Sequence, residues 1–393
     1  MNRLAMLAAA ILVVLAGSTP ATDEAASSRQ TVQVQLNGHA FTLPAGFEIE
    51  LVAGPPLVDR PITAAFDDEG RLFVADSSGS NDKIDKQLAE KPHRIVRLED
   101  TDGDGRFDKS VVFADKMMFP EGTMWFDGSL YVTAPPSIWK LTDTDGDGVA
   151  DRREEWFPGK TLTGCANDLH GPYLGPDGWI YWAKGAFAKQ TYERVGKSLR
   201  VIPDLPLNIL GKDIPVASEQ KPSDSQPSPL NSQLAWSTRA SHIFRCRPDG
   251  SGLEVVMTGG MDNPVDVVFT PGGERIFTST FLVHPGGGLR DGLLHAVYGG
   301  IYGKDHDPIH EPQHKWTGPG TMPVLAHLGG AAAPCGLEIY RSRVFGADYE
   351  SNLFTCCFNM HKITRHVLEP DGATFKSHDS DFLVSSNLDF HPT

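Results

Sequence analysis

One histidine opens the most informative stretch of the chain, residues 167–187, NDLHGPYLGPDGWIYWAKGAF. After His170 come the turn Gly175-Pro176-Asp177-Gly178 and an aromatic, β-branched run at 179–182, which predicts a strand. The turn has a physical basis, because Pro presets φ and Gly accepts a positive φ. We expect His170 on a loop held by a rigid β scaffold, where an imidazole can act as a base. A surface or hydrogen-bonded structural histidine is the alternative.

Two nearly identical acidic loops carry the strongest local signal for a metal. Carboxylates at loop positions 1, 3, 5 and 9, with Gly at 6, match the oxygen cage that Ca²⁺ prefers. Position 12, a bidentate Glu in an EF-hand, is Val111 in the first loop and Glu154 in the second. We therefore expect tighter binding at the second loop. The candidate ligands are Asp100, Asp102, Asp104 and Asp108, then Asp143, Asp145, Asp147, Asp151 and Glu154.

The role of such calcium would be structural. The flanks of both loops predict strands, so the ion would clamp a hairpin rather than join two helices. Four acids this close repel one another unless a cation is present. A solvated acidic turn is the alternative.

Histidines recur at helical metal-ligand spacing further along the chain. They are His306, His310 and His314, but Pro308 and Pro312 lie between them and forbid a regular helix. We expect a polar loop there.

The cysteines point to thiols rather than to a disulfide framework. Five are present, so at least one is unpaired within the chain, and no Cys-x-x-Cys-His haem attachment motif occurs. We expect buried thiols. They are Cys165, Cys246, Cys335, Cys356 and Cys357.

The same turn-and-strand pattern recurs along the chain, which predicts a repeat protein. Turn residues precede short aromatic or β-branched runs at 72–74, 130–132, 179–182, 275–278 and 353–355. The acidic loops give a period of about 43 residues, the separation of Asp100 and Asp143, and propeller blades repeat at about 40–50 residues. The sequence therefore predicts an all-β chain built as a β-propeller.

Composition limits the classes of partner. The chain has 393 residues and is 40% hydrophobic, enough to bury a large core. Its formal charge of −15 argues against nucleic acid and against anionic membrane surfaces.

The N-terminus predicts export. Residues 1–21 resemble a signal peptide with a 13-residue apolar core, where a membrane span needs about 20. After cleavage we expect no transmembrane span and a periplasmic or cell-surface location; an uncleaved anchor is the alternative. Residues 22–43 form a linker with a first strand pair, and residues 44–393 form the propeller, with insertions at about 203–235 and 285–321.

Three spaced segments resemble the soluble quinoprotein glucose and sorbosone dehydrogenases. The sequence as a whole is closer to the planctomycete-type "membrane-bound dehydrogenase" propellers, and this resemblance covers about residues 44–393. The segments are His170 with Leu174-Gly-Pro-Asp-Gly-Trp-Ile-Tyr181, Gly260-Met-Asp262-Asn263-Pro264, and Ala333-Pro334-Cys-Gly336-Leu337.

The resemblance implies a six-bladed propeller that oxidises a sugar or alcohol with pyrroloquinoline quinone. By position, His170 takes the role of general base and Asn263 contacts the cofactor. Relatives with a cytochrome module suggest cytochrome c as electron acceptor. The family has Arg before Asn-Pro, whereas this chain has Asp262, which reverses the sign of the charge beside an anionic quinone. The alternative is a non-catalytic carbohydrate- or partner-binding propeller stabilised by calcium.

The end of the sequence resembles the opening of a further blade. Each unit opens with a short Pro-containing segment, and residues 386–393 look like a sixth such opener with no strand after it. We therefore expect five blades plus an incomplete sixth, a tail that packs poorly after Ser385, and association through the open edges.

Overall fold

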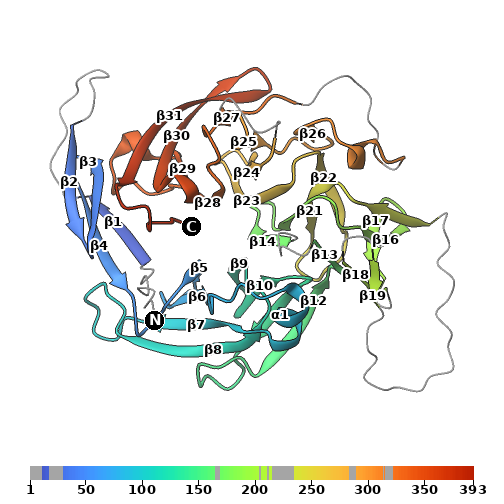
Figure 1. Ribbon diagram of the computed structural model, residues 1–393, viewed down its shortest axis with the longest axis horizontal. Coiled ribbons are helices and arrows are strands. Elements are labelled where there is room, and N and C mark those ends of the chain that lie inside the picture. The colour runs from blue at the N-terminus through green and yellow to red at the C-terminus, as the bar shows by residue number, and fades with distance from the viewer. Residues whose placement is uncertain are drawn as a thin grey trace, which may run out of the picture.

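The protein is an all-β propeller. The computed structural model describes residues 11–16, 30–163, 169–202, 205–209, 212–214, 234–282, 289–312, 314 and 322–393. Its antiparallel sheets stand around a common centre (Figure 1). The predicted all-β propeller is thereby confirmed, and the number of blades stays a prediction.

The first four large sheets follow one another along the chain. The first contains β5 (Pro61–Phe66), β6 (Leu72–Asp76), β7 (His93–Glu99) and β8 (Lys109–Met117). The second contains β9 (Gly122–Phe126), β10 (Ser129–Ala134), β11 (Ser137–Thr142) and β12 (Arg152–Pro158). The third contains β14 (Leu169–Leu174), β15 (Ile180–Lys184), β21 (Ser241–Cys246), β22 (Glu254–Gly259) and β26 (Ile301–Tyr302). The fourth contains β23 (Asn263–Phe269), β24 (Arg275–Thr280), β25 (Gly292–His295) and β27 (Ala326–His327).

The last large sheet joins strands from the N-terminal and the C-terminal parts of the chain. Its strands are β28 (Pro334–Ile339), β29 (Leu353–Cys357), β30 (Lys362–Asp371), β31 (Thr374–Ser385), β3 (His39–Pro44) and β2 (Thr31–Leu36). The predicted N-terminal strand pair is confirmed as β2 and β3. It belongs to the propeller rather than to a separate segment, because Phe41 of β3 pairs with Ser385 of β31.

Shorter elements complete the described chain. Within the expected signal segment, β1 (Ile11–Ala16) pairs antiparallel with β4 (Phe47–Ala53). The range 285–321, expected as an insertion, supplies β25 and β26 to two large sheets. No helix in the described ranges has the length and apolar content needed to cross a membrane. The other elements are β13 (Thr161–Leu162), β16 (Gln190–Val195), β17 (Ser198–Val201), β18 (Leu207–Ile209), β19 (Lys212–Ile214), β20 (Ala235–Thr238), α1 (Ile84–Glu90), η1 (Asp307–His310), η2 (Ala347–Tyr349) and η3 (Phe358–Met360).

The innermost strands bring distant parts of the sequence together at the axis. Strand β5 contacts β9, β9 contacts β14, β14 contacts β23, and β23 contacts β28. Each of these strands lies at one edge of its sheet, and the starts of β9, β14 and β23 lie together at one end of the ring.

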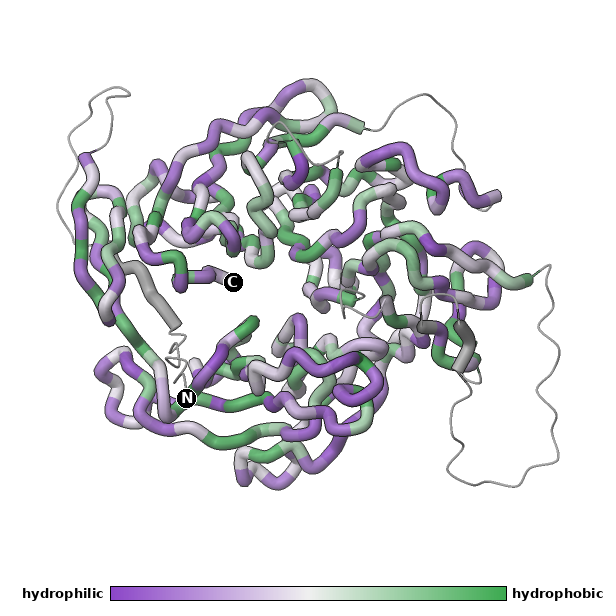
Figure 2. Tube along the Cα trace, viewed as in Figure 1, coloured by the Kyte–Doolittle hydropathy of each residue, from purple (hydrophilic) through white to green (hydrophobic). Residues whose placement is uncertain are grey.

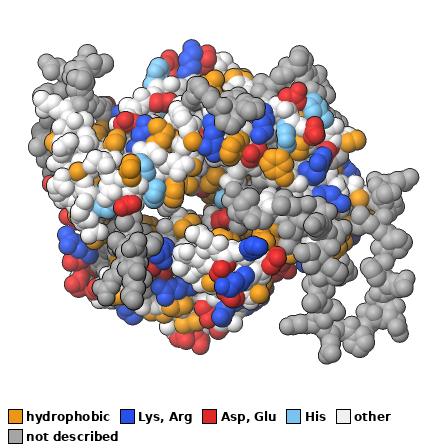
Figure 3. All heavy atoms as spheres, in the orientation of Figure 1, with side chains coloured by type: hydrophobic (Ala, Val, Ile, Leu, Met, Phe, Trp, Pro, Cys, Tyr) orange, Lys and Arg blue, Asp and Glu red, His pale blue; other side chains and the backbone are white. Residues whose placement is uncertain are grey.

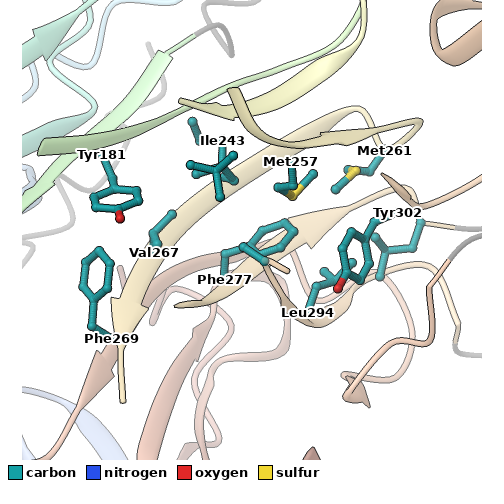
Figure 4. Packing of buried hydrophobic residues seen from close by; sticks show 13 residues of the cluster. Tyr181, Ile243, Met257, Met261, Val267, Phe269, Phe277, Leu294 and Tyr302 are labelled. Carbon is teal, nitrogen blue, oxygen red and sulfur yellow. The ribbon is translucent and has the colours of Figure 1, made fainter. Parts of the chain in front are cut away.

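Hydrophobic side chains pack between neighbouring sheets. In Figure 4, Tyr181, Ile243 and Met257 of the third sheet face Val267 and Phe277 of the fourth. Hydrophobic and hydrophilic residues alternate along many strands (Figure 2), as expected when the two faces of a strand meet different surroundings. Charged side chains of both signs are interspersed on the face shown in Figure 3.

The C-terminal tail packs against the last sheet, so the prediction of a poorly packed tail is wrong for residues 386–393. The ring of Phe390 lies edge-on to Phe41 at 5.1 Å, and His361 Nδ1 bonds the Phe390 carbonyl at 2.7 Å. Cys335 Sγ donates to the Pro392 carbonyl at 3.2 Å. An aromatic residue and backbone carbonyls thus anchor a segment that contains no strand, close to the centre in Figure 1.

Candidate active site

His170 lies in a strand, which corrects the prediction of a loop. It is the second residue of β14, and its backbone pairs with Ala183 of β15 before the register shifts ahead of Tyr173. The side chain is nearly buried, with 8% of the residue exposed. The strand begins earlier than expected because the ladder with β15 extends back to Leu169.

The predicted base and the predicted cofactor contact lie in direct contact. His170 Nε2 is 3.0 Å from Oδ1 of Asn263, although 93 residues separate them. Asn263 is the first residue of β23, and β14 contacts β23 along the axis. The two innermost strands therefore bring both residues to the same end of the ring.

Burial keeps the imidazole neutral. It lowers the pKa of His170 to about 4, while the hydrogen bonds to Asn263 and to the backbone of Glu121 oppose this shift. Oε2 of Glu121 lies 3.7 Å from Nδ1. At neutral pH His170 is therefore uncharged and able to accept a proton.

Two glycines allow the close approach that sets the position of His170. Gly171 has φ +105°, a conformation that side-chain-bearing residues rarely adopt. A Cβ at Gly122, the first residue of β9, would lie 1.9 Å from the Gly171 carbonyl oxygen. Thr133 also donates a hydrogen bond to that oxygen. The start of β14 is thus held against the second sheet.

Cationic and aromatic groups stand beside Asn263. Lys304 Nζ lies 2.9 Å from Oδ1 of Asp262 and 5.7 Å from the centroid of Phe281, whose preceding residue Thr280 pairs with Asn263. Arg290 Cζ lies 3.9 Å from the same centroid. An imidazole, an amide and two cations can contact the oxygens of an anionic quinone, and an aromatic ring can pack on its plane, so the residues present fit pyrroloquinoline quinone.

The acidic loops form two matching clusters. One ligand atom each from Asp100, Asp102 and Asp104 lies within 4.8 Å of the others, and Asp143, Asp145 and Asp147 repeat this arrangement. In both loops the first Asp accepts hydrogen bonds from the two loop glycines, for example from Gly146 and Gly148 to Asp143 at 2.7 and 2.8 Å. These oxygen clusters fit calcium.

Three of the predicted calcium ligands lie outside these clusters. Asp108 accepts a hydrogen bond from Thr101 Oγ1 at 2.7 Å, and Asp151 accepts one from Thr144 Oγ1 at 2.5 Å. Glu154 in β12 is paired with Arg152 at 2.8 Å. Strand β12 begins at Arg152, so Glu154 belongs to the strand that follows the acidic loop rather than to the loop itself.

The three histidines have different partners, and no regular α-helix joins them within the described residues, as the intervening prolines predicted. His310 pairs with Asp305, His314 Nε2 lies 3.0 Å from Thr238 Oγ1, and the His306 ring contacts Phe187. The described cysteines are free thiols; Cys246 and Cys357 are buried, and Cys335 and Cys356 are partly buried. Cys165 lies outside the described residues.

Sequence reasoning missed Glu121, Phe281, Arg290 and Lys304. Glu121 had a signal, because it closes the segment Phe119-Pro120-Glu121 that opens the second sheet, as Asn263 opens the fourth. Lys304 had none, since it follows a two-residue strand in a range expected to be an insertion.

The fold is shared with one solved carbohydrate-active protein, and two further structures show a weaker likeness. A Trichoderma reesei protein of Carbohydrate-Active Enzymes Family AA12 is 12% identical, with 94% of this chain and 91% of that chain covered, at a TM-score of 0.51. The PQQ-bound aldose sugar dehydrogenase of Streptomyces coelicolor is 15% identical, with 83% of this chain and 81% of that chain covered, at a TM-score of 0.47. The PQQ domain of pyranose dehydrogenase from Coprinopsis cinerea is 12% identical, with 92% of this chain and 88% of that chain covered, at a TM-score of 0.48.

Sequence comparison places the chain in a family. It matches none of the curated proteins. A family model matches residues 34–282 and 290–393, which is most of the chain. The chain belongs to the family described as a domain of unknown function, DUF7133.

Proposed function

We propose that this propeller is a quinoprotein-type oxidoreductase that oxidises a sugar or an alcohol, with His170 as general base. The observation that carries the proposal is the 3.0 Å contact between His170 Nε2 and Asn263. His170 and Asn263, to which the family resemblance gives separate roles, are 93 positions apart in the sequence and lie in contact where β14 and β23 meet. The low pKa of His170, about 4, keeps the base unprotonated at neutral pH.

The proposed chemistry divides between the residues and the cofactor. Pyrroloquinoline quinone, when bound, would accept the hydride from the substrate C–H bond. Asn263 and Lys304 would hold it through their polar groups. His170 takes the proton of the substrate hydroxyl at Nε2, which requires that the ring proton lies on Nδ1 and that Asn263 turns its amide oxygen away from Nε2. Glu121 at Nδ1 then stabilises the imidazolium that forms.

The setting of this activity is also part of the proposal. The N-terminal segment supports export to the periplasm or cell surface, where a cytochrome c could accept the electrons. Calcium at the two acidic clusters would stabilise the hairpins around them.

A second candidate function is carbohydrate or partner binding without turnover. Asp262 favours it, since a carboxylate stands where the quinoprotein family has Arg.

Reconstitution separates the two functions. Pyrroloquinoline quinone and Ca²⁺ are added to the purified chain, which is then gel-filtered and assayed for quinone absorbance and for sugar-dependent dye reduction. The proposal predicts both signals. Sugar binding by calorimetry, with neither quinone retention nor dye reduction, supports the binding protein instead.

A further inference from the structure

The Asn-Pro segment lacks the Arg of the quinoprotein family, but a lysine from another part of the chain places a cation beside it. Asp262 immediately precedes Asn263, and its Oδ1 receives the Lys304 ammonium at 2.9 Å. Both side chains are partly exposed, at 29% for Lys304 and 25% for Asp262. The pair is therefore open to a ligand at the end of the ring.

The backbone around Lys304 is fixed by glycines. A Cβ at Gly260 would lie 1.9 Å from the Lys304 carbonyl oxygen, and a Cβ at Gly303 would lie 2.7 Å from the Met261 nitrogen. The Gly260 amide also donates to the Tyr302 carbonyl at 2.8 Å. Only residues without a side chain permit this approach, so Lys304 is held next to Asp262 by its own main chain.

A second set of contacts anchors the far side of the same loop. Glu311 receives Arg239 Nε at 2.6 Å, and His314 contacts Thr238 Oγ1 at 3.0 Å. Between these anchors and β26, the chain turns through η1. The loop that carries Lys304 is therefore attached to the third sheet through β26 at one end and to the end of β20 at the other.

Phe281 ties this cation to the candidate active site. The Lys304 ammonium lies 5.7 Å from its ring centroid, and the backbone amide of Phe281 donates to the buried Asp291 at 3.3 Å. Thr280, the residue before Phe281, is the Cα partner of Asn263. The ammonium is thus kept near the strand ends where Asn263 begins.

We infer that Lys304 is the ligand-binding cation of this site and that Asp262 is a positioning residue that orients it toward the quinone cofactor. The inference rests on the proposed function. An ammonium carries three donors and Asp262 takes one, which leaves donors for a carboxylate or quinone oxygen. Asp262 therefore does not present an unpaired negative charge to the ligand, and the departure from the family's Arg is offset by Lys304.

The test measures the affinity of pyrroloquinoline quinone itself, by quenching of tryptophan fluorescence, without any turnover assay. Lys304→Met should weaken binding by about 10- to 100-fold, the loss expected for one charge-assisted hydrogen bond. Lys304→Arg should lose less affinity than Lys304→Met, because the charge and its hydrogen-bond donors are retained. Lys86→Met is the matched control, because Lys86 on α1 also pairs with an aspartate, Asp82, at 2.9 Å.

Each outcome bears on one claim. If the native chain binds pyrroloquinoline quinone and Lys304→Met binds it equally tightly, the inference is overturned while the proposed function stands. Absence of binding by the native chain contradicts the proposed function, and the inference falls with it. Melting temperatures of all variants identify any loss of affinity that comes from unfolding.

Discussion

Nε2 of His170 and Oδ1 of Asn263 lie 3.0 Å apart, where two innermost strands of neighbouring sheets meet. The burial of His170 at this place has a consequence for the pH dependence of stability. The folded pKa of His170 is about 4, below the ordinary value of 6.5. Between these values the unfolded chain binds more protons, so this residue makes stability rise with pH from about 4 to 6.5 and level off above. His170→Gln should remove that rise in denaturant midpoints measured across the window, and an unchanged slope would contradict it.

Asp266 contributes the opposite slope. Burial raises its pKa to about 6 from 3.8, against the opposing hydrogen bond from Tyr173. Between pH 3.8 and 6 the folded chain binds more protons, so stability should fall as the pH rises through this window. Asp266→Asn should abolish the fall, and the same unfolding series measures it. A fall that persists in this variant would assign it to another group.

Asp266 also joins three innermost strands. Its carboxylate accepts Tyr173 from β14 and, at 2.7 Å, the Leu337 amide of β28. Tyr173→Phe should destabilise the protein by about 1–3 kcal/mol, the cost of leaving a buried acceptor without one donor. Chemical denaturation measures this loss. Tyr298→Phe is the control, because Tyr298 is exposed and bonds Glu254 at 2.9 Å; equal effects in both variants would refute the joining role.

The sequence predicted the sheets better than the site. Turn residues followed by aromatic and β-branched runs correctly predicted strands such as β15 and β24, because these signals are local. The all-β propeller followed from their recurrence. The pairing of β3 with β31 was missed, since it depends on how the chain closes in space.

The site depended on contacts that local patterns do not encode. His170 and Asn263 carried recognisable segments, but their contact arises from the neighbouring positions of β14 and β23. Lys304 reaches Asp262 only because two glycines let the β26 loop approach Gly260. The prediction that His170 lies on a loop was wrong, because pairing with β15 outweighed the turn-rich sequence around it.

Gly122 tests whether the position of His170 depends on backbone packing. Gly122→Ala should destabilise the protein by about 1–3 kcal/mol, because its Cβ would overlap the Gly171 carbonyl. Thermal melting measures the loss. Gly54→Ala is the control, since a Cβ at Gly54 would contact nothing within 4 Å. Similar melting temperatures for the two variants would show that this approach is not restrictive.

Calcium should raise the melting temperature and EDTA should lower it. A ligand that binds only the folded chain stabilises it by about 2.7 kcal/mol at 100 times its Kd. Asp147→Asn should remove the part of the shift that the second cluster contributes, because Asp147 belongs to that cluster. Asp249→Asn, in a turn outside both clusters, should retain it. A full shift in Asp147→Asn would exclude this loop as the calcium site.

The central claim, that His170 is the base of a sugar-oxidising site, is tested most directly by turnover of His170→Gln loaded with pyrroloquinoline quinone and Ca²⁺. The account predicts a loss of about 10²–10⁴ in rate, with quinone binding and the melting profile at neutral pH close to native. Above pH 6 the native rate should be independent of the protonation of His170, whose pKa is about 4. Native turnover by His170→Gln at saturating sugar would contradict the claim.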